Sequence, residues 1–299
     1  MTPSVSIIIP AYNDPDGLER CLQALSIQDY PAQQFEVLVV DNGSQQSLES
    51  VAKAFPFVRF LREETPGSYA ARNTALSQAR GAIIAFTDAD CVPDPDWVRC
   101  GASYFNDVTA LRVVGGRIPL FASKHNAPTW IESYELALGF PQQANIEQAH
   151  YSVTANLFTN KATLDKVGPF DAQLLSGGDK DWGQRAHRAG VQMLYADDVA
   201  VRHPARSSWS ALSKKRRRHI GGFVARARTK YPAPVAYGVV FSKAMLPPVK
   251  RLLLTRTEPG SGTVERAQLY ARVWCVASAL QLLSAKEVVR LALGGERTR

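Results

Sequence analysis

Two aspartates that follow an apolar run have the clearest chemical potential in this sequence. Asp88 and Asp90 are separated by one alanine and come directly after residues 82–87, which read AIIAFT. Carboxylates two positions apart on a turn can point into one cleft and hold Mg²⁺ or Mn²⁺, and a bound diphosphate supplies further oxygens. Aspartate pairs are also common in solvated turns, so this pair has to be weighed together with its surroundings.

Other polar residues follow the remaining apolar runs of the N-terminal half. Tyr12 and Asn13 come after residues 5–10, and the DNGS segment at 41–44 comes after residues 35–40. These runs are rich in β-branched residues and are typical of strands buried on both faces. Helical patterns alternate with them, which predicts βαβ units and a parallel sheet. Ligands bind at the carboxyl ends of such strands, so we expect these polar residues to line one cleft.

Two common phosphate-binding loops are absent from the sequence. A dinucleotide fold places GxGxxG after its first strand, and the corresponding segment here reads AYNDPDG. The P-loop pattern GxxxxGK[ST] occurs nowhere in the 299 residues. A divalent metal bound by the aspartate pair is another way to hold phosphates.

Four segments occur in an order and spacing that resemble the family 2 glycosyltransferases. They read VSIIIPAYND, VLVVDNGS, TPGSYAARNTALSQARGAIIAFTDADC and GGDKDWGQRAHRAG, and the resemblance covers roughly residues 4–205. The resemblance implies an α/β fold that is GT-A-like and of Rossmann type, with a mostly parallel sheet flanked by helices. It also implies an enzyme of the hexosyltransferase type that transfers a sugar from a nucleotide diphosphate sugar to a hydroxyl, with inversion at the anomeric carbon.

The resemblance implies donor-binding roles for five residues. Pro10 and Tyr12 are expected to flank the nucleotide base. Asp41 is expected to accept a hydrogen bond from the base, most naturally from the N3–H of uracil or thymine, which makes a UDP-sugar the expected donor. Arg72 is expected near the base and the phosphates, and Asp88 is expected to reach the ribose or the metal. Taken singly, Tyr12 could be a packing residue and Arg72 an exposed helix charge.

A bound Mg²⁺ or Mn²⁺ ion is also implied by the resemblance. Asp90 is the expected ligand, with Asp88 contributing. His203 lies at a position similar to that of a late histidine ligand in several GT-A enzymes. The alternative for His203 is a surface histidine, or a core histidine with its hydrogen bonds satisfied.

Asp179 matches the aspartate of the family's Glu-Asp motif, which deprotonates the acceptor hydroxyl. A sugar hydroxyl is a weak nucleophile, and a carboxylate within hydrogen-bond reach assists its attack on the anomeric carbon. The usual glutamate is replaced here by Gly178. Two alternatives therefore stay open, with Asp181 as the base or with Asp179 only capping the helix that follows.

Charge is unevenly distributed along the chain. The net charge of +8 consists of −8 over residues 1–200 and +16 over residues 201–299. Together with the resemblance, which implies a GT-A domain at 1–205, this division predicts a basic, mainly helical extension at 206–299, which contains the run 214–218, KKRRR. Such asymmetry favours an anionic membrane or a phosphorylated substrate as partner. Nucleic acid is disfavoured because no aromatic residues alternate with the arginines.

We expect a protein that acts at the cytoplasmic face of a membrane without spanning it. No signal peptide opens the sequence, no apolar run reaches about 18 residues, and the four cysteines suggest reduced core thiols. The acceptor is expected to be a glycan or a lipid-linked hydroxyl, as in polysaccharide biosynthesis, bound partly by residues 126–152. Two rivals are a sugar nucleotidylyltransferase, whose glycine-rich basic loop is missing, and a non-catalytic nucleotide-sugar or lipid-binding module.

Overall fold

The apolar runs of the N-terminal half form neighbouring parallel strands in the computed structural model. β1 (Val5–Ala11) lies between β2 (Phe35–Asp41) and β4 (Ile83–Thr87), and β3 (Val58–Arg62) pairs with the other edge of β2. The consecutive residues 7–9 of β1 are all 0% exposed, because helices cover both faces of the sheet. This explains why the strand reads as a continuous apolar run instead of an alternating one.

The remainder of the sheet is mixed. β8 (Asn156–Asn160) runs antiparallel to β4 and to β6 (Arg112–Arg117), and β6 pairs in parallel with β9 (Gln192–Pro204). The short β5 (Val92–Pro93) pairs with β9 in the antiparallel direction. The strand order is β3-β2-β1-β4-β8-β6-β9-β5, and a further short strand, β7, comprises Leu120–Phe121. The order places β4 and its carboxyl end near the middle of the sheet.

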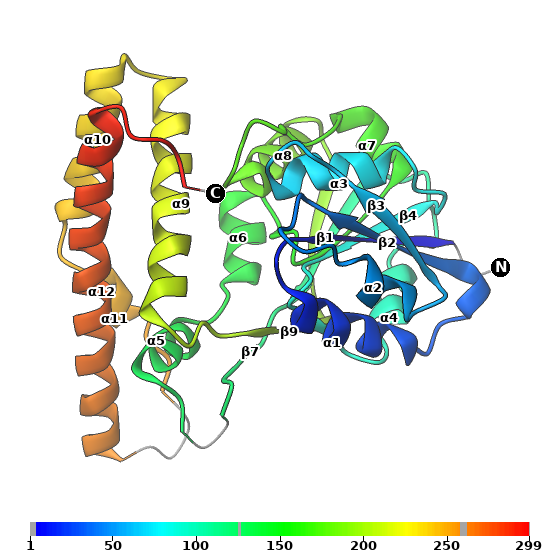
Figure 1. The fold of residues 1–299 in the computed structure, drawn as a ribbon, viewed down its shortest axis with the longest axis horizontal. Coiled ribbons are helices and arrows are strands. Elements are labelled where there is room, and N and C mark those ends of the chain that lie inside the picture. Colours follow the sequence, from blue (N-terminus) through cyan, green and yellow to red (C-terminus); the bar gives the residue numbers. More distant parts are fainter. Residues whose placement is uncertain (1–3, 125–126, 258–261, 299) are drawn as a thin grey trace. The chain divides into compact units, whose positions relative to one another are not determined.

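Helices lie on both sides of the sheet (Figure 1). Their bounds are α1 (Pro15–Ser26), α2 (Glu49–Lys53), α3 (Ser68–Leu76), α4 (Trp97–Ser103), α6 (Gln142–Ala149), α7 (Lys161–Val167) and α8 (Gly178–Arg188), with a 3₁₀ turn at Ala32–Gln34. Helices α3 and α8 contribute to the same apolar cluster as β1, β2 and β4. The expected α/β fold with flanking helices is confirmed.

The structure describes residues 4–124, 127–257 and 262–298, which form two units. The first unit holds the sheet and consists of residues up to 119 together with 141–203. The second unit consists of residues 120–140 and those from 204 onward, and is helical. Its helices are α5 (Trp130–Leu138), α9 (Trp209–Arg228), α10 (Ala233–Met245), α11 (Val249–Leu253) and α12 (Thr263–Ala292).

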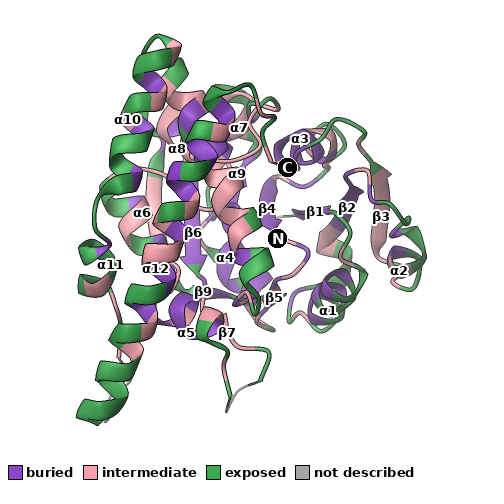
Figure 2. Cartoon of the chain, turned by 60° about the vertical axis from the view of Figure 1, so that its left-hand side comes forward, coloured by how far each residue is buried: buried purple, intermediate pink, exposed green. Residues whose placement is uncertain are grey.

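The apolar stripe of α12 forms the core of the second unit. Val273, Val276 and Leu280 pack with Tyr134 of α5 and Leu212 of α9. Exposed residues dominate α10 and α11, whereas the strands of the first unit are largely buried (Figure 2). Within the residues that are described, no helix combines the length and apolar character that crossing a membrane requires.

The cysteines are not all core residues. Cys21, Cys91 and Cys100 are buried, whereas Cys275 on α12 is exposed. The expectation of four core thiols is therefore wrong for Cys275, because α12 turns this position away from the apolar stripe that packs on α5 and α9.

Candidate active site

The carboxyl ends of β1 and β2 are tied together by hydrogen bonds between their loops. Asn13 N–H donates to Ser44 Oγ (2.9 Å), and Gln45 N–H donates to Asn13 Oδ1 (2.8 Å). Asn13 has a φ of 52°, a left-handed conformation that asparagine adopts more readily than most residues. Tyr12 precedes this turn and is 37% exposed, while Pro10 is partly exposed at the end of β1. The Tyr12 ring is therefore not part of the core.

Asp41 ends β2 and is fully buried. Its Oδ1 atom accepts a hydrogen bond from Ser44 N–H (2.9 Å), and Arg62 Nη1 lies 3.6 Å from Oδ2. No hydrogen bond to Oδ2 is formed by any group in the described ranges. Since buried polar atoms are nearly always hydrogen-bonded in native proteins, Oδ2 is suited to accept a hydrogen bond from a ligand.

Arg72 and Asp88 form an ion pair that joins α3 to the end of β4. Arg72 Nη2 lies 2.6 Å from Asp88 Oδ1, and Arg72 is only 2% exposed. The guanidinium also lies 5.5 Å from the centre of the Tyr69 ring. The alternative that Arg72 is an exposed helix charge is therefore wrong, because α3 turns this side chain into the protein.

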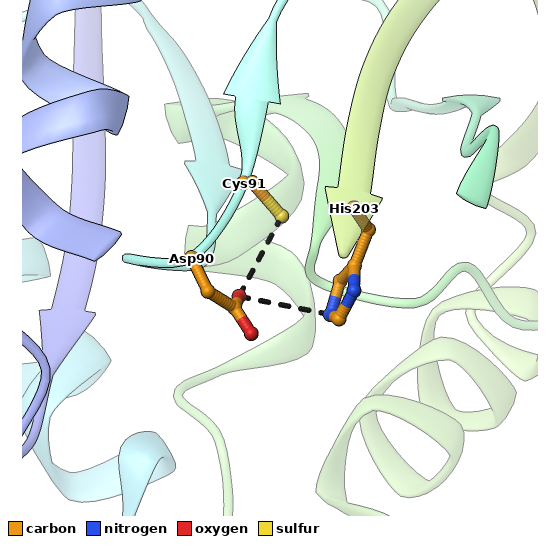
Figure 3. Close-up of side chains that lie close together, drawn as sticks. All are labelled: Asp90, Cys91 and His203. Atoms are coloured by element: carbon orange, nitrogen blue, oxygen red, sulfur yellow. Dashed lines mark hydrogen bonds and ion pairs between the residues drawn. The ribbon is translucent and has the colours of Figure 1, made fainter. Parts of the chain in front are cut away.

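Asp90, Cys91 and His203 gather where the turn after β4 meets the end of β9 (Figure 3). Asp90 Oδ1 lies 3.6 Å from His203 Nε2 and 4.0 Å from Cys91 Sγ. The pairing of β5 with β9 matches Val92 with Arg202 and so brings His203 to this turn, where it is 5% exposed. Sequence reasoning singled out Asp90 and His203 but not Cys91, which carries no motif of its own.

The donor atoms of this cluster fit a divalent metal. A carboxylate oxygen suits Mg²⁺ or Mn²⁺, and an imidazole nitrogen beside it suits a first-row transition metal better than Mg²⁺. Burial raises the pKa of the Cys91 thiol, and Asp90 and Asp88 add to the rise. The thiol is therefore protonated, and only a thiolate would be a good ligand. Asp90 and His203 are thus the two residues of the cluster whose side chains are suited to bind the ion.

Asp179 lies in the first turn of α8, partly exposed. Its Oδ1 atom accepts hydrogen bonds from Lys180 N–H (2.8 Å) and from the Tyr69 hydroxyl (3.3 Å). Burial raises the pKa of the Asp179 carboxyl, although Lys180 N–H, Arg72 and the Tyr69 hydroxyl act to lower it. A raised carboxyl pKa makes a stronger base at neutral pH.

Asp181, the alternative base, faces a different partner. Its Oδ2 atom lies 3.0 Å from Arg185 Nε one turn along α8, and its side chain is 40% exposed. Asp179, by contrast, is linked to Asp88 through Tyr69 and Arg72. The structure thus groups Asp179 with the aspartate pair, and it places Asp181 in a helical surface ion pair.

The segment expected to bind the acceptor is divided between the two units. Residues 127–140 belong to the second unit and 141–152 to the first, while residue 126 lies outside the described residues. In the first unit, Gln142 Nε2 donates to Ser152 Oγ (2.9 Å) and fixes the two ends of this stretch.

Trp182 of α8 is fully buried, and its Nε1 donates to Gly168 O (2.9 Å), so its ring packs in the core.

Comparison with known proteins finds glycosyltransferases among the relatives of this chain. The model of the family described as "Glycosyl transferase family 2" matches residues 6–161. The chain is 39% identical over 218 residues to glycosyltransferase AglE of Haloferax volcanii, with 71% of both proteins covered. It is 27% identical over 252 residues to the pre-mycofactocin glycosyltransferase of Mycobacterium tuberculosis, of which it spans 51%.

Solved structures resemble the chain along nearly its whole length. The mannosyltransferase PcManGT of Pyrobaculum calidifontis, in complex with GDP-Man and Mn²⁺, superposes with a TM-score of 0.61 at 20% identity, over 97% of this chain and 87% of that one. TarS of S. aureus in complex with UDP-GlcNAc superposes with a TM-score of 0.56 at 16% identity, over 98% and 92% of the two chains. At such identities the likeness concerns the fold.

Proposed function

The chain belongs to glycosyl transferase family 2, and we propose that it is a metal-dependent enzyme that inverts the anomeric centre of the sugar it transfers. It is a glycosyltransferase with a GT-A-like fold, which sets aside the nucleotidylyltransferase and the non-catalytic module. We assign donor binding and chemistry to the domain at 1–205. The extension at 206–299 is assigned to the acceptor and its surroundings.

The donor in this proposal is a UDP-sugar. Uracil presents a single N–H donor, whereas guanine presents two adjacent ones, N1–H and the exocyclic amine. Asp41 has one carboxylate oxygen engaged by Ser44, and its Oδ2 atom has no hydrogen bond from the described residues. One remaining acceptor matches one donor, which supports uracil. The exposed ring of Tyr12 and the neighbouring Pro10 are suited to flank the base.

The metal in this proposal is Mn²⁺ or Mg²⁺, held by Asp90 and His203. Their facing oxygen and nitrogen atoms support Mn²⁺ as the preferred ion. Asp88 uses Oδ1 for Arg72, so its other oxygen is assigned to the ribose or to the ion. When bound, the ion offsets charge on the departing nucleotide diphosphate.

Asp179 is the proposed base. Its carboxylate takes the proton of the acceptor hydroxyl while the hydroxyl oxygen bonds to the anomeric carbon, and the bond from that carbon to the diphosphate breaks on the opposite face. The observation that carries the proposal is the run of contacts from Asp179 through Tyr69 and Arg72 to Asp88. It joins the candidate base to the aspartate pair.

The second unit supports an acceptor that carries phosphate. Within the KKRRR run of α9, Lys215 Nζ binds Glu135 Oε1 (2.9 Å), and Arg206 Nη1 lies 3.4 Å from the other oxygen of the same carboxylate. Burial lowers the pKa of Lys215, and the charge of Arg206 lowers it further. Because two cations share one carboxylate, an added phosphate would relieve their repulsion. We therefore assign these residues to the phosphate of a lipid-linked glycan acceptor.

A membrane location follows from the same unit in this proposal. Lys214 is exposed, while Lys215 and Arg216 turn inward, the latter donating from Nε to Ser284 Oγ (2.6 Å). Within the run, the surface set is therefore Lys214, and the inward set is Lys215 and Arg216. We assign the surface set to the anionic lipid of the cytoplasmic leaflet, where the protein would bind peripherally.

A donor panel tests the reaction. Release of nucleoside diphosphate is measured with Mn²⁺ and with Mg²⁺ for UDP-, GDP- and dTDP-sugars, in the presence of lipid-phosphate acceptors. The proposal expects release from UDP-sugars and more of it with Mn²⁺. Release from GDP-sugars alone would contradict the assignment of Asp41, and undiminished release in the presence of a chelator would contradict the metal.

A further inference from the structure

The space beside Gly178 is filled by the ring of Tyr69. A Cβ atom at position 178 would lie 2.7 Å from Tyr69 Cε2 and 2.9 Å from Cζ. Such separations are well inside van der Waals contact, so no larger residue fits at position 178 while the ring stays in place. Position 178 is the one at which this chain departs from the Glu-Asp motif.

Aromatic packing holds the Tyr69 ring there. Tyr69 is 6% exposed and stacks on Phe170, with ring centres 5.7 Å apart. Phe170 in turn contacts Trp182 of α8 at 5.3 Å and Phe86 of β4 at 5.5 Å. The ring is therefore fixed to α8 and to the strand that leads to the aspartate pair.

The hydroxyl of Tyr69 faces Asp179, and the charged groups around it are few. Its O–H donates to Asp179 Oδ1 at 3.3 Å. The charges of Arg72, on the same helix as Tyr69, and of Asp88, after β4, also act on the Asp179 carboxyl, and the backbone N–H of Lys180 donates to it. Arg72 and Tyr69 are three positions apart in α3, which places both on the face that meets α8.

We propose that Tyr69 is a positioning residue for Asp179, with its ring taking the place of the missing glutamate side chain and its hydroxyl orienting the carboxylate. This inference rests on the proposed role of Asp179 as base. A hydrogen bond donated to a carboxylate favours its charged form, so the hydroxyl keeps the base ready to accept a proton in a site whose burial opposes charge.

Tyr69→Phe tests the inference because it keeps the ring and removes the hydroxyl. We expect an unchanged melting temperature and donor KM, a kcat lower by about tenfold at neutral pH, and an acid limb of the kcat profile that moves up by about one pH unit. The limb moves up because the carboxyl loses a donor that favours ionisation. Tyr104→Phe is the matched control, since it removes a Tyr–Asp hydrogen bond to Asp198, outside the site.

An exchange of side chains gives a second test. Gly178→Glu alone should lose transfer because the new side chain meets the ring, and adding Tyr69→Ala should restore part of it. A Tyr69→Phe enzyme with wild-type kcat and acid limb, in a protein whose Asp179→Asn variant is inactive, would overturn the inference and leave Tyr69 as a core residue. Transfer retained by Asp179→Asn would instead remove the proposed base, which separates the two failures.

Discussion

Asp90 Oδ1 lies 3.6 Å from His203 Nε2, although one residue follows β4 and the other lies near the end of β9. The two are brought together by the short pairing of β5 with β9, which matches Val92 with Arg202. A pair of unlike donor atoms held at this distance by backbone hydrogen bonds is organised before any ligand arrives. The first prediction follows from this pair.

Asp90→Ala is expected to abolish metal-dependent donor binding while the protein remains folded. His203→Ala is expected to lower metal affinity by at least about tenfold, the scale on which even residues that only orient ligands act. Calorimetry of UDP binding with and without Mn²⁺ measures both. Asp107→Ala is the control, because Asp107 is an exposed aspartate that binds Thr109 in a separate turn. Unchanged metal dependence in Asp90→Ala would remove the metal assignment.

Asp179→Asn is expected to preserve donor affinity and to lower transfer by about 10²-fold or more, the scale of general-base catalysis. The amide is nearly isosteric with the carboxylate but cannot take a proton. Asp181→Asn is the matched control and should transfer normally, since Asp181 pairs with Arg185 at 3.0 Å. The reverse result, loss in Asp181→Asn only, would make Asp181 the base.

The pH dependence of transfer should reflect the raised pKa of Asp179. The base works only when ionised, so kcat falls as pH drops through the pKa of its carboxyl. Since burial raises that pKa, the acid limb should lie above the value of about 3.9 that is usual for aspartate. A kcat profile from about pH 3 to 8 measures the limb. A limb at the ordinary aspartate value would show that Asp179 is either solvated or not the base.

Asp41→Asn is expected to weaken UDP binding by about tenfold or more, because a charge-assisted hydrogen bond to the base is replaced by a neutral one. Binding of Mn²⁺ should not change, since Asp41 is outside the Asp90–His203 pair. Competition of UDP and GDP for the wild-type and variant proteins measures the effect. A loss that is equal for both nucleotides would indicate that Asp41 supports the fold, through Ser44 and Arg62, and does not read the base.

Anionic vesicles should bind the protein at low salt and release it at high salt. Each basic residue near an anionic surface contributes about 1 kcal/mol, and salt screens this term. Lys214→Gln should weaken co-sedimentation and spare turnover on a soluble acceptor, because Lys214 is exposed. Lys215→Gln should leave co-sedimentation unchanged and lower turnover, because Lys215 turns inward to Glu135. Equal binding to neutral and anionic vesicles, or none to either, would contradict the membrane proposal.

Much of the first unit follows from local sequence. The runs at 5–10, 35–40 and 82–87 are apolar without alternation because both faces of each strand are covered, and this alone predicts the parallel core. The same pattern predicts the location of three site residues, Asp41, Asp88 and Asp90. The end of a strand determines where the adjoining residues lie.

Other parts of the site depend on contacts that no local pattern encodes. The approach of His203 to Asp90 requires the β5–β9 pairing, and the turn of Arg72 toward Asp88 requires knowing which face of α3 meets the sheet. The joining of residues 120–140 to the C-terminal helices likewise reflects apolar packing of Tyr134 with Leu212 and Val273. Such long-range packing emerges only when the whole chain is folded.

The close approach of the Tyr69 ring to Gly178 also constrains how this sequence can change over time. A side chain gained at position 178 before the ring at position 69 is lost would be 2.7 Å from ring atoms, so that order of substitutions passes through a damaged intermediate. The opposite order leaves a cavity that the later side chain can fill. The two positions therefore form an epistatic pair, and across relatives a large aromatic residue at position 69 should coincide with glycine at position 178.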